Sequence, residues 1–373
     1  MHKFVFPMAL IKDIYHLSFY ERLANSLAKV LPNFDNKKFI KLVMPSNFAE
    51  MEWKQRTQHT TDVLHLFMPT NFAESALLLK SIIVQLKADG FGEHRLEFMF
   101  LPAYIASYGL NDLKSAIEAL ELVTQFISAE FAVRPFLIKY HEEMMVQMLK
   151  WSTHENHHVR RFASEGSRPR LPWGLAISAL KVNPNAILPI VENLKSDPSE
   201  YVRRSVANNL NDITKDNPGI VIGLAKKWKG IGKETDAIIK HACRSLLKAG
   251  HPEILSFYGL DATGLSTSDF EIENDTVKIG ESLAFSFHIK NDDVLPRYIR
   301  LEYAIYYLKS NGQQNAKVFK ISERTYQPKE KCLVKRKQSF KPITTRKFYA
   351  GAHKIGILVN GKEQANVKFL LDD

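Results

Sequence analysis

A motif that recurs through the middle of the chain limits the folds open to this sequence more than any other feature. The segment His-Val-Arg-Arg-Phe-Ala at residues 158–163 aligns with Tyr-Val-Arg-Arg-Ser-Val at residues 201–206, an offset of 43. A weaker third copy, Ala-Ile-Ile-Lys-His-Ala, occupies residues 237–242. A period of about 40 residues indicates a structural unit that is repeated and buries its apolar face against its neighbours.

Helical periodicity accompanies the repeat from the N-terminus to about residue 258. The clearest apolar stripe, spaced by 4, 4 and 3 residues and therefore on one helix face, is Val202, Val206, Leu210 and Ile213. Asp197 is the expected N-cap of this helix, with Pro198 in its first turn and Glu200 in a capping-box position. Two helices per unit at this period predict HEAT-like repeats, which stack into a solenoid with a concave surface.

The pattern changes at about residue 264. Short, often alternating runs replace the long amphipathic ones, at residues 282–289, 298–308, 317–321, 333–340, 351–359 and 365–371. Asn360-Gly361 is a strong hairpin signal between the last two runs. About seven short strands favour an Ig-like sandwich. We therefore expect a mostly α chain, with a HEAT-like-repeat α-solenoid at residues 1–262 followed by a C-terminal all-β Ig-like sandwich domain at residues 263–373.

The chain has a formal net charge of +11, and the positive charge is concentrated in two stretches. Residues 150–250 carry 17 Lys and Arg against 9 Asp and Glu, and residues 264–373 carry 19 against 13. Such a distribution favours an anionic polymer as partner, although a solvated basic face is the alternative interpretation.

Other compositional signals point to the cytoplasm. No apolar run is long enough for a transmembrane helix, and the apolar start at residues 4–11 is interrupted by Lys12 without a cleavage site for a secretory signal. The two cysteines, Cys243 and Cys332, fall in what we expect to be different domains. They argue against a structural disulfide or a cysteine-based zinc site, as is typical of a reducing compartment.

Three acids are candidates for chemistry: Glu130, Glu165 and Asp212. Each lies among polar or arginine neighbours at the edge of a predicted helix. For any single acid, neutralising a nearby arginine or capping a helix is the favoured interpretation. Because they occur in successive units of a solenoid, they are able to converge on its concave face.

Arginines near these acids are candidates for phosphate binding, since guanidinium groups offer paired donors to phosphate oxygens. The predicted DNA-binding residues are Arg134, Arg160, Arg161, Arg168, Arg170, Trp173, Arg203 and Arg204. The alternative for the arginines is pairing with acids such as Glu155 and Glu200. The alternative for Trp173 is a core anchor beside Pro169 and Pro172.

The sequence does not support a metal site or a phosphate-binding loop. The histidines at residues 154, 157 and 158 lack matching ligand spacing and are better explained as a polar helix start. The segment at residues 230–235 lacks the full spacing of a phosphate-binding loop. We expect no metal and no organic cofactor.

Four contiguous segments carry a family resemblance: residues 128–136, 159–161, 164–173 and 201–213. Through them, residues 100–250 resemble the AlkC/AlkD superfamily of HEAT-like-repeat alkylpurine DNA glycosylases. The Arg-Pro-Arg-Leu-Pro-Trp run at residues 168–173 is similar to the AlkC branch, which also carries an appended Ig-like domain.

What the resemblance implies is a monofunctional N-glycosyl hydrolase of base excision repair. Its substrates would be cationic alkylated bases in DNA, namely 3-methyladenine, 3-methylcytosine and 1-methyladenine. The family's active-site acids fall on Glu130, Glu165 and Asp212. An alkylated base that is already cationic leaves readily, so carboxylates need only stabilise an oxocarbenium-like sugar and position water.

Two other functions stay open from the sequence. One is a non-catalytic nucleic-acid-binding HEAT-repeat protein, and the other is a protein-binding HEAT scaffold. Steep salt dependence of duplex binding would distinguish the glycosylase and the nucleic-acid-binding protein, which both bind DNA, from the protein-binding scaffold. We expect a monomer without membrane association, because a solenoid wrapped on one duplex needs no second copy.

Overall fold

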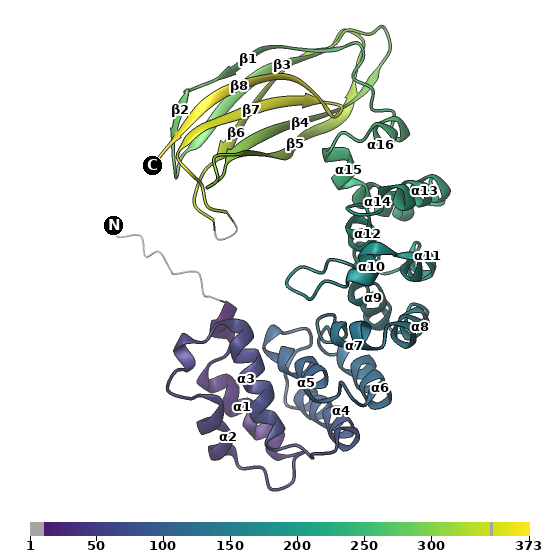
Figure 1. Cartoon of the computed structure of the whole chain (residues 1–373), viewed down its shortest axis with the longest axis vertical. Coiled ribbons are helices and arrows are strands. Elements are labelled where there is room, and N and C mark those ends of the chain that lie inside the picture. Colours follow the sequence, from purple (N-terminus) through teal and green to yellow (C-terminus); the bar gives the residue numbers. More distant parts are fainter. Residues whose placement is uncertain (1–10, 344–345) are drawn as a thin grey trace. The chain divides into compact units, whose positions relative to one another are not determined.

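The structure is a computed structural model that describes residues 11–343 and 346–373. It divides into two compact units (Figure 1). Unit 1 is helical and contains the described residues up to Val221 together with Trp228–Ala242. Unit 2 contains Ile222–Lys227 and Cys243–Asp373, and most of it is a β sandwich. The predicted fold class, a helical-repeat solenoid followed by an Ig-like sandwich, is confirmed.

The first part of unit 1 is a set of packed helices with well-marked starts. Side chains of Asp35, Asn71 and Asp112 accept hydrogen bonds from the first-turn amides of three of them. Such caps satisfy amides that have no partner within the helix. The helices are α1 (Leu17–Ala28), α2 (Asn36–Val43), α3 (Trp53–His65), α4 (Phe72–Ala88), α5 (Phe100–Tyr108) and α6 (Leu113–Thr124).

The repeated motif forms the second part of unit 1. Its three copies fall in α9, α12 and α14, where α12 packs against both α9 and α14 (Figure 1). Helices α8 and α11 pack against each other and against α9. The bounds are α7 (Arg134–Lys139), α8 (His141–Trp151), α9 (His157–Gly166), α10 (Ser178–Val182), α11 (Leu188–Leu194), α12 (Glu200–Ile213), α13 (Pro218–Trp228) and α14 (Lys233–Ala242).

Helix α12 shows what its sequence pattern determined. All four members of the predicted apolar stripe are buried, which confirms the face they share. The predicted cap is wrong, because the N-cap is Ser199 and the helix begins at Glu200. The carboxylate of Asp197 accepts from the Ser199 amide at 2.8 Å and from Arg160 of α9. Arg160, from another repeat, thus binds the Asp197 carboxylate that the local pattern assigned to the helix cap.

Beyond its segment of α13, unit 2 consists of α15 (Arg244–Lys248), α16 (Pro252–Phe257) and two sheets. Within the described residues the sheets have the strand orders β1-β3-β6 and β2-β8-β7-β4-β5, with β2 and β8 parallel and the other pairs antiparallel. The strands are β1 (Leu265–Ile272), β2 (Thr276–Lys278), β3 (Ser282–Asn291), β4 (Arg297–Leu308), β5 (Gln314–Tyr326), β6 (Lys331–Ser339), β7 (Gly351–Val359) and β8 (Lys362–Asp372).

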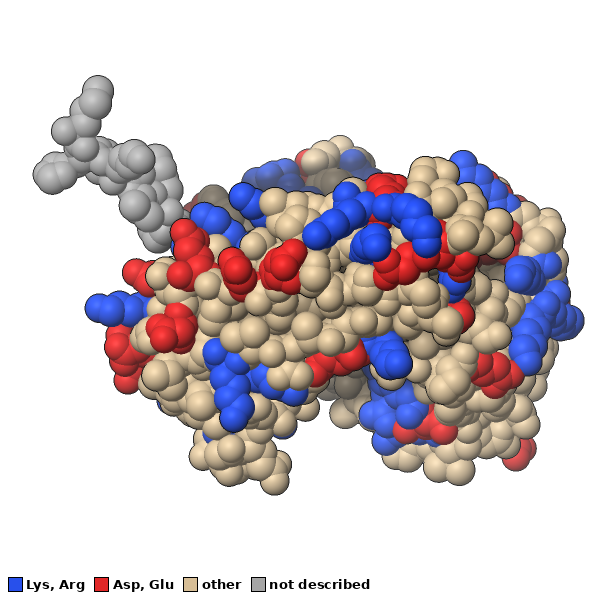
Figure 2. Space-filling model, turned by 90° about the horizontal axis from the view of Figure 1, so that it is seen from above, with Lys and Arg blue, Asp and Glu red and all other residues tan. Residues whose placement is uncertain are grey.

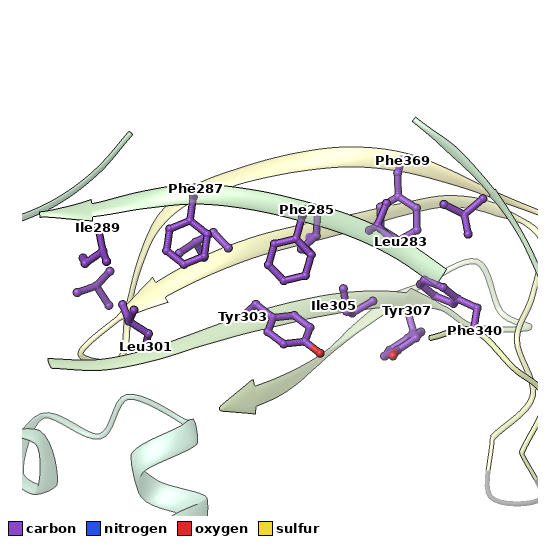
Figure 3. Close-up of a cluster of buried hydrophobic side chains, with 14 of the residues drawn as sticks. Leu283, Phe285, Phe287, Ile289, Leu301, Tyr303, Ile305, Tyr307, Phe340 and Phe369 are labelled. Atoms are coloured by element: carbon purple, nitrogen blue, oxygen red, sulfur yellow. The ribbon is translucent and has the colours of Figure 1, made fainter. Parts of the chain in front are cut away.

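Core-facing side chains of β3 and β4 build the centre of the sandwich. Phe285 and Phe287 of β3 project toward Tyr303 and Ile305 of β4 (Figure 3). Successive side chains of a strand point to opposite faces, so every second residue of β3 is buried. The hairpin prediction is confirmed, since Asn360 and Gly361 join β7 to β8 with φ values of 48° and 76°. Positive φ at both positions is typical of a type I′ turn.

The predicted boundary between residues 262 and 263 lies close to the start of β1. Compact packing nevertheless joins α15 and α16 to the sandwich. The Asn360 side chain donates to the carbonyl of Asp261 at 2.8 Å, and a Cβ on Gly361 would lie 3.0 Å from the Gly250 Cα. Both cysteines are free thiols and belong to unit 2, so the expectation that they lie in different domains is wrong. In the described part of the chain, no helix has the length and apolar character to cross a membrane.

Candidate functional site

The three candidate acids form one row of alternating charge in unit 1. Arg161 donates to Glu130 at 3.1 Å and lies 3.8 Å from Glu165. Arg168 donates to Glu165 at 2.6 Å and to Asp212 at 2.8 Å. Residues from the turn before α7, from the end of α9 and from α12 are thereby brought together, although they are far apart in the sequence.

Each acid therefore neutralises an arginine, as the simpler interpretation of the sequence expected. What the structure adds is continuity, because Arg161 and Arg168 each lie between two carboxylates. Lys215 ends the row with a 3.0 Å contact to Asp212. Removal of any one member leaves its neighbours with an unbalanced charge in a poorly solvated place.

Hydroxyl groups that sequence reasoning missed complete the row. Ser205 donates to Glu165 at 2.7 Å, and Ser128 donates to Glu130. A signal for Ser205 exists in the sequence, since Ser205, Asn209 and Asp212 are spaced by 4 and 3 on α12. All three are buried, and Asn209 donates to the Ser164 carbonyl of α9 at 2.8 Å. This polar stripe holds α12 against α9 and places Asp212 near Glu165.

The row keeps its arginines strongly cationic. Burial by itself would lower the pKa of Arg168, but the carboxylates of Glu165 and Asp212 raise it above the ordinary value. The pKa of Arg161 is raised in the same way, against burial, by Glu130 and Glu165. Tyr201 covers Arg161, with the guanidinium carbon 4.8 Å from the ring centroid. Tyr201 is a further member of the site that the sequence did not single out.

The first arginine of each Val-Arg-Arg motif supports its own repeat. Arg160 donates to the carbonyls of His154 and Glu155, at 2.9 and 2.7 Å. Arg203 donates to the carbonyls of Asp197 and Pro198, at 2.7 and 2.9 Å. The acceptors are separated by the same 43 residues as the arginines. Each guanidinium therefore ties down the turn that precedes its own helix.

The second arginine of each motif projects elsewhere. Arg161 enters the row of acids, whereas the side chain of Arg204 is 63% exposed and pairs with Glu200 at 2.7 Å. Arg170 is also partly exposed and pairs with Asp216 at 2.6 Å. On the face drawn in Figure 2, basic and acidic side chains are interspersed rather than separated into one basic surface.

Two predicted DNA-binding residues occupy opposite environments. Arg134 is fully buried, where burial and then Arg168 lower its pKa to about 10, and it donates to the carbonyls of Gly166 and Leu175. Trp173 is 71% exposed, so the alternative of a core anchor is wrong for this residue. No group of metal-binding side chains was found among the described residues, and α9 begins at His157 as a polar helix start.

Comparison with known proteins covers both units. A family model described as "Uncharacterised protein YhaZ, C-terminal Ig-like domain" matches residues 266–373. Uncharacterized protein YhaZ of Bacillus subtilis (strain 168) is 40% identical over 363 residues, which are 97% of this chain and 99% of that protein. The Pseudomonas fluorescens alkylpurine DNA glycosylase AlkC, solved bound to DNA containing an abasic site analog, is 35% identical with a TM-score of 0.91.

The chain belongs to the AlkC family. The structural match covers 98% of this chain and 100% of the AlkC chain, so the sandwich is part of what the two proteins share. The resemblance stated from short segments between residues 100 and 250 is therefore confirmed over nearly the whole chain. YhaZ is a member of the same family.

Proposed function

We propose that this protein is a DNA repair glycosylase that hydrolyses the N-glycosidic bond of cationic alkylated bases. The observation that carries the proposal is the whole-length match to AlkC, an alkylpurine DNA glycosylase that binds DNA containing an abasic site analog. The row of three carboxylates supplies groups suited to this reaction. The substrate classes proposed are 3-methyladenine, 3-methylcytosine and 1-methyladenine, and the mode is monofunctional.

The proposed mechanism requires little acid catalysis. A methylated base that carries positive charge takes the bonding electrons as it leaves, and the sugar becomes oxocarbenium-like. We assign Glu130, Glu165 and Asp212 to stabilising that cation and to orienting the attacking water. Charged groups held in place before the reaction stabilise a developing charge without first having to reorganise. The DNA must approach a row whose carboxylates already bind arginines, so the sugar cation would share them with Arg161 and Arg168.

The predicted DNA contacts divide by exposure. We propose Arg170, Arg204 and Trp173 for direct contact, because their side chains reach the surface of unit 1. Arg161 and Arg168 would hold the acids in position. We assign Arg134, Arg160 and Arg203 a supporting role, since backbone carbonyls bind their guanidinium groups. In unit 2, Lys335, Arg336 and Lys337 of β6 are proposed for further phosphate contacts. A monomer acting in the cytoplasm fits this proposal.

The test is base release from a duplex that contains one 3-methylcytosine, and in parallel from randomly methylated DNA, quantified by mass spectrometry. Wild-type protein should release free alkylbase, and Asp212→Asn or Glu165→Gln should lower the release rate by about a hundredfold or more, as for loss of one preorganised charge. Duplex affinity should be retained. Thermal unfolding of each variant checks folding, because both acids belong to a buried ion-paired row.

Two results would contradict the proposal in different ways. Base release that survives both substitutions would remove the assigned roles of the acids. Absence of release by the wild-type protein, with duplex binding intact, would favour the non-catalytic binder.

A further inference from the structure

The loop between α9 and α10, residues 167–177, holds Trp173 in an unusual position. The side chain is exposed, and the backbone has a φ of 65°, in the left-handed region. A bulky residue rarely adopts this conformation unless its surroundings hold it there. The other end of the loop carries Arg168, which binds Glu165 and Asp212. The loop therefore connects an exposed indole to the row of acids.

Helix α3 holds the tip of the loop from one side. The ammonium group of Lys54 donates to the carbonyl of Trp173 at 2.9 Å. The ring of Trp53 lies 6.5 Å from that of Trp173, with 53° between the ring planes. No sequence pattern predicted these contacts, which join residues about 120 positions apart.

Arg134 holds the loop from the other side. It donates to the carbonyl of Leu175, two residues beyond Trp173, and to that of Gly166 at 3.0 Å. Gly174 gives this approach room, because a Cβ there would make tight contacts of 3.0 Å with the Cδ2 of Leu171 and 3.2 Å with the Cδ of Arg134. The base of the loop is closed by the amide of Ile177, which donates to the carbonyl of Pro169 at 3.2 Å.

The held indole borders a groove of about 390 Å³ in unit 1. Its walls are mostly apolar and include Trp53, Met99, Pro102 and Phe131. Phe131 directly follows Glu130, so the groove lies beside one end of the row of acids. An aromatic ring at such a place offers a stacking surface for a planar base.

We infer that Lys54 is a positioning residue, which acts through the Trp173 carbonyl to keep the indole at the edge of this groove. The inference rests on the proposed function, because the stacking partner is a base of the bound DNA. Lys54 is exposed and touches the loop tip, so its substitution removes one holding contact without opening the core. It is therefore a better probe than the buried Arg134.

The kinetic test uses Lys54→Met in the full-length protein, with Lys37→Met on α2 as control. Both lysines are exposed, and both changes remove one positive charge. The single-turnover rate of release from the 3-methylcytosine duplex should fall about tenfold in Lys54→Met, the scale of one lost charge-assisted hydrogen bond. Its duplex affinity should stay within about twofold of that of Lys37→Met, since both lose the same charge.

A spectroscopic test reports the position of the indole directly. The chain has 4 tryptophans, and labelling with 5-fluorotryptophan gives each a ¹⁹F resonance. The Trp173 signal is assigned by its loss in Trp173→Phe. Lys54→Met should shift or broaden this signal relative to its position in the control Lys37→Met. The signals of the buried Trp151 and Trp228 should be the same in the two variants.

Each outcome decides a separate point. An unchanged Trp173 signal in Lys54→Met overturns the inference. So does a loss of duplex affinity beyond that of the control with the release rate retained, which would make Lys54 a phosphate contact. If the wild-type protein releases no base, the proposed function fails, and the ¹⁹F spectra still decide whether Lys54 holds Trp173.

Discussion

The two arginines of each Val-Arg-Arg motif are adjacent in the sequence but lie in different environments. Arg203 binds two backbone carbonyls of its own repeat, and Arg204 extends from the surface of α12 toward Glu200. The difference follows from helix geometry, because adjacent residues are about 100° apart around the axis. In the second motif Arg203 therefore supports the fold and the exposed Arg204 can reach a partner, whereas in the first motif both Arg160 and Arg161 are bound within unit 1.

This division predicts that substitution of Arg203 lowers stability, whereas substitution of Arg204 mainly weakens duplex binding. Arg203→Ala should lower the free energy of unfolding by about 2 kcal/mol, because it removes charged hydrogen bonds to the preceding turn. Arg204→Ala should change it by less than about 1 kcal/mol, since an exposed ion pair contributes little. Urea denaturation measures both. In duplex binding, Arg204→Ala should reduce the slope of log K against log salt by about 1, as for one lost phosphate contact.

Equal destabilisation by the two substitutions would contradict the assigned roles. So would an unchanged salt slope in Arg204→Ala.

At the scale of elements, the start of α9 carries a histidine cluster that the acid row does not use. His158 lies 3.2 Å from His94, measured between their Nε2 atoms, and its ring is next to that of His157. Burial, followed by these two imidazoles, lowers the pKa of His158 to about 4. Glu93 acts in the opposite direction and Arg161 in the same one.

The lowered pKa predicts loss of stability on mild acidification. An unfolded histidine has a pKa of about 6.5, so below that pH the unfolded chain binds a proton that folded His158 does not. The free energy of unfolding should therefore fall as the pH drops from about 6.5 toward 4. In His158→Gln, the free energy of unfolding should fall less between pH 7.5 and pH 5, as measured by urea denaturation. The control His141→Gln, on α8, should keep the fall seen in the wild-type protein. An unchanged pH dependence in His158→Gln would show that other groups dominate.

At the scale of the whole molecule, the chain combines a helical repeat unit with a sandwich that the AlkC family shares. Its net charge of +11 is distributed over both units, and the exposed arginines Arg170 and Arg204 pair with Asp216 and Glu200. Specific phosphate contacts should therefore set its affinity for DNA.

Duplex binding should consequently depend steeply on salt. The five cationic side chains proposed for phosphate contact would weaken affinity by about 500-fold between 50 and 200 mM salt, as counterions are released on binding. Fluorescence anisotropy with a labelled duplex measures this dependence. A change of less than about threefold would contradict the DNA-binding assignment and favour the protein-binding scaffold.

The sequence by itself determined the helical repeat, most of the strands and the change from helices to strands along the chain. Apolar spacing on α12, the repeat offset, the alternation in β3 and the Asn360-Gly361 turn are local signals, and each of them matches the structure. Strands β1 and β2 lie where no run was singled out. Strand β2 pairs in parallel with the last strand, β8, a partner about 90 residues away that leaves no local pattern.

Only the tertiary structure decided what the polar residues do. The sequence pointed to Glu130, Glu165 and Asp212 but not to the row in which Arg161 and Arg168 join them. It placed Arg134 with the DNA contacts and did not indicate Lys54 at all. The physical reason is that periodicity records which face of an element is buried. The partner of a charged side chain depends instead on how separate elements pack together. That packing brings residues from α3, α7, α9 and α12 to the loop at residues 167–177 and to the row of acids.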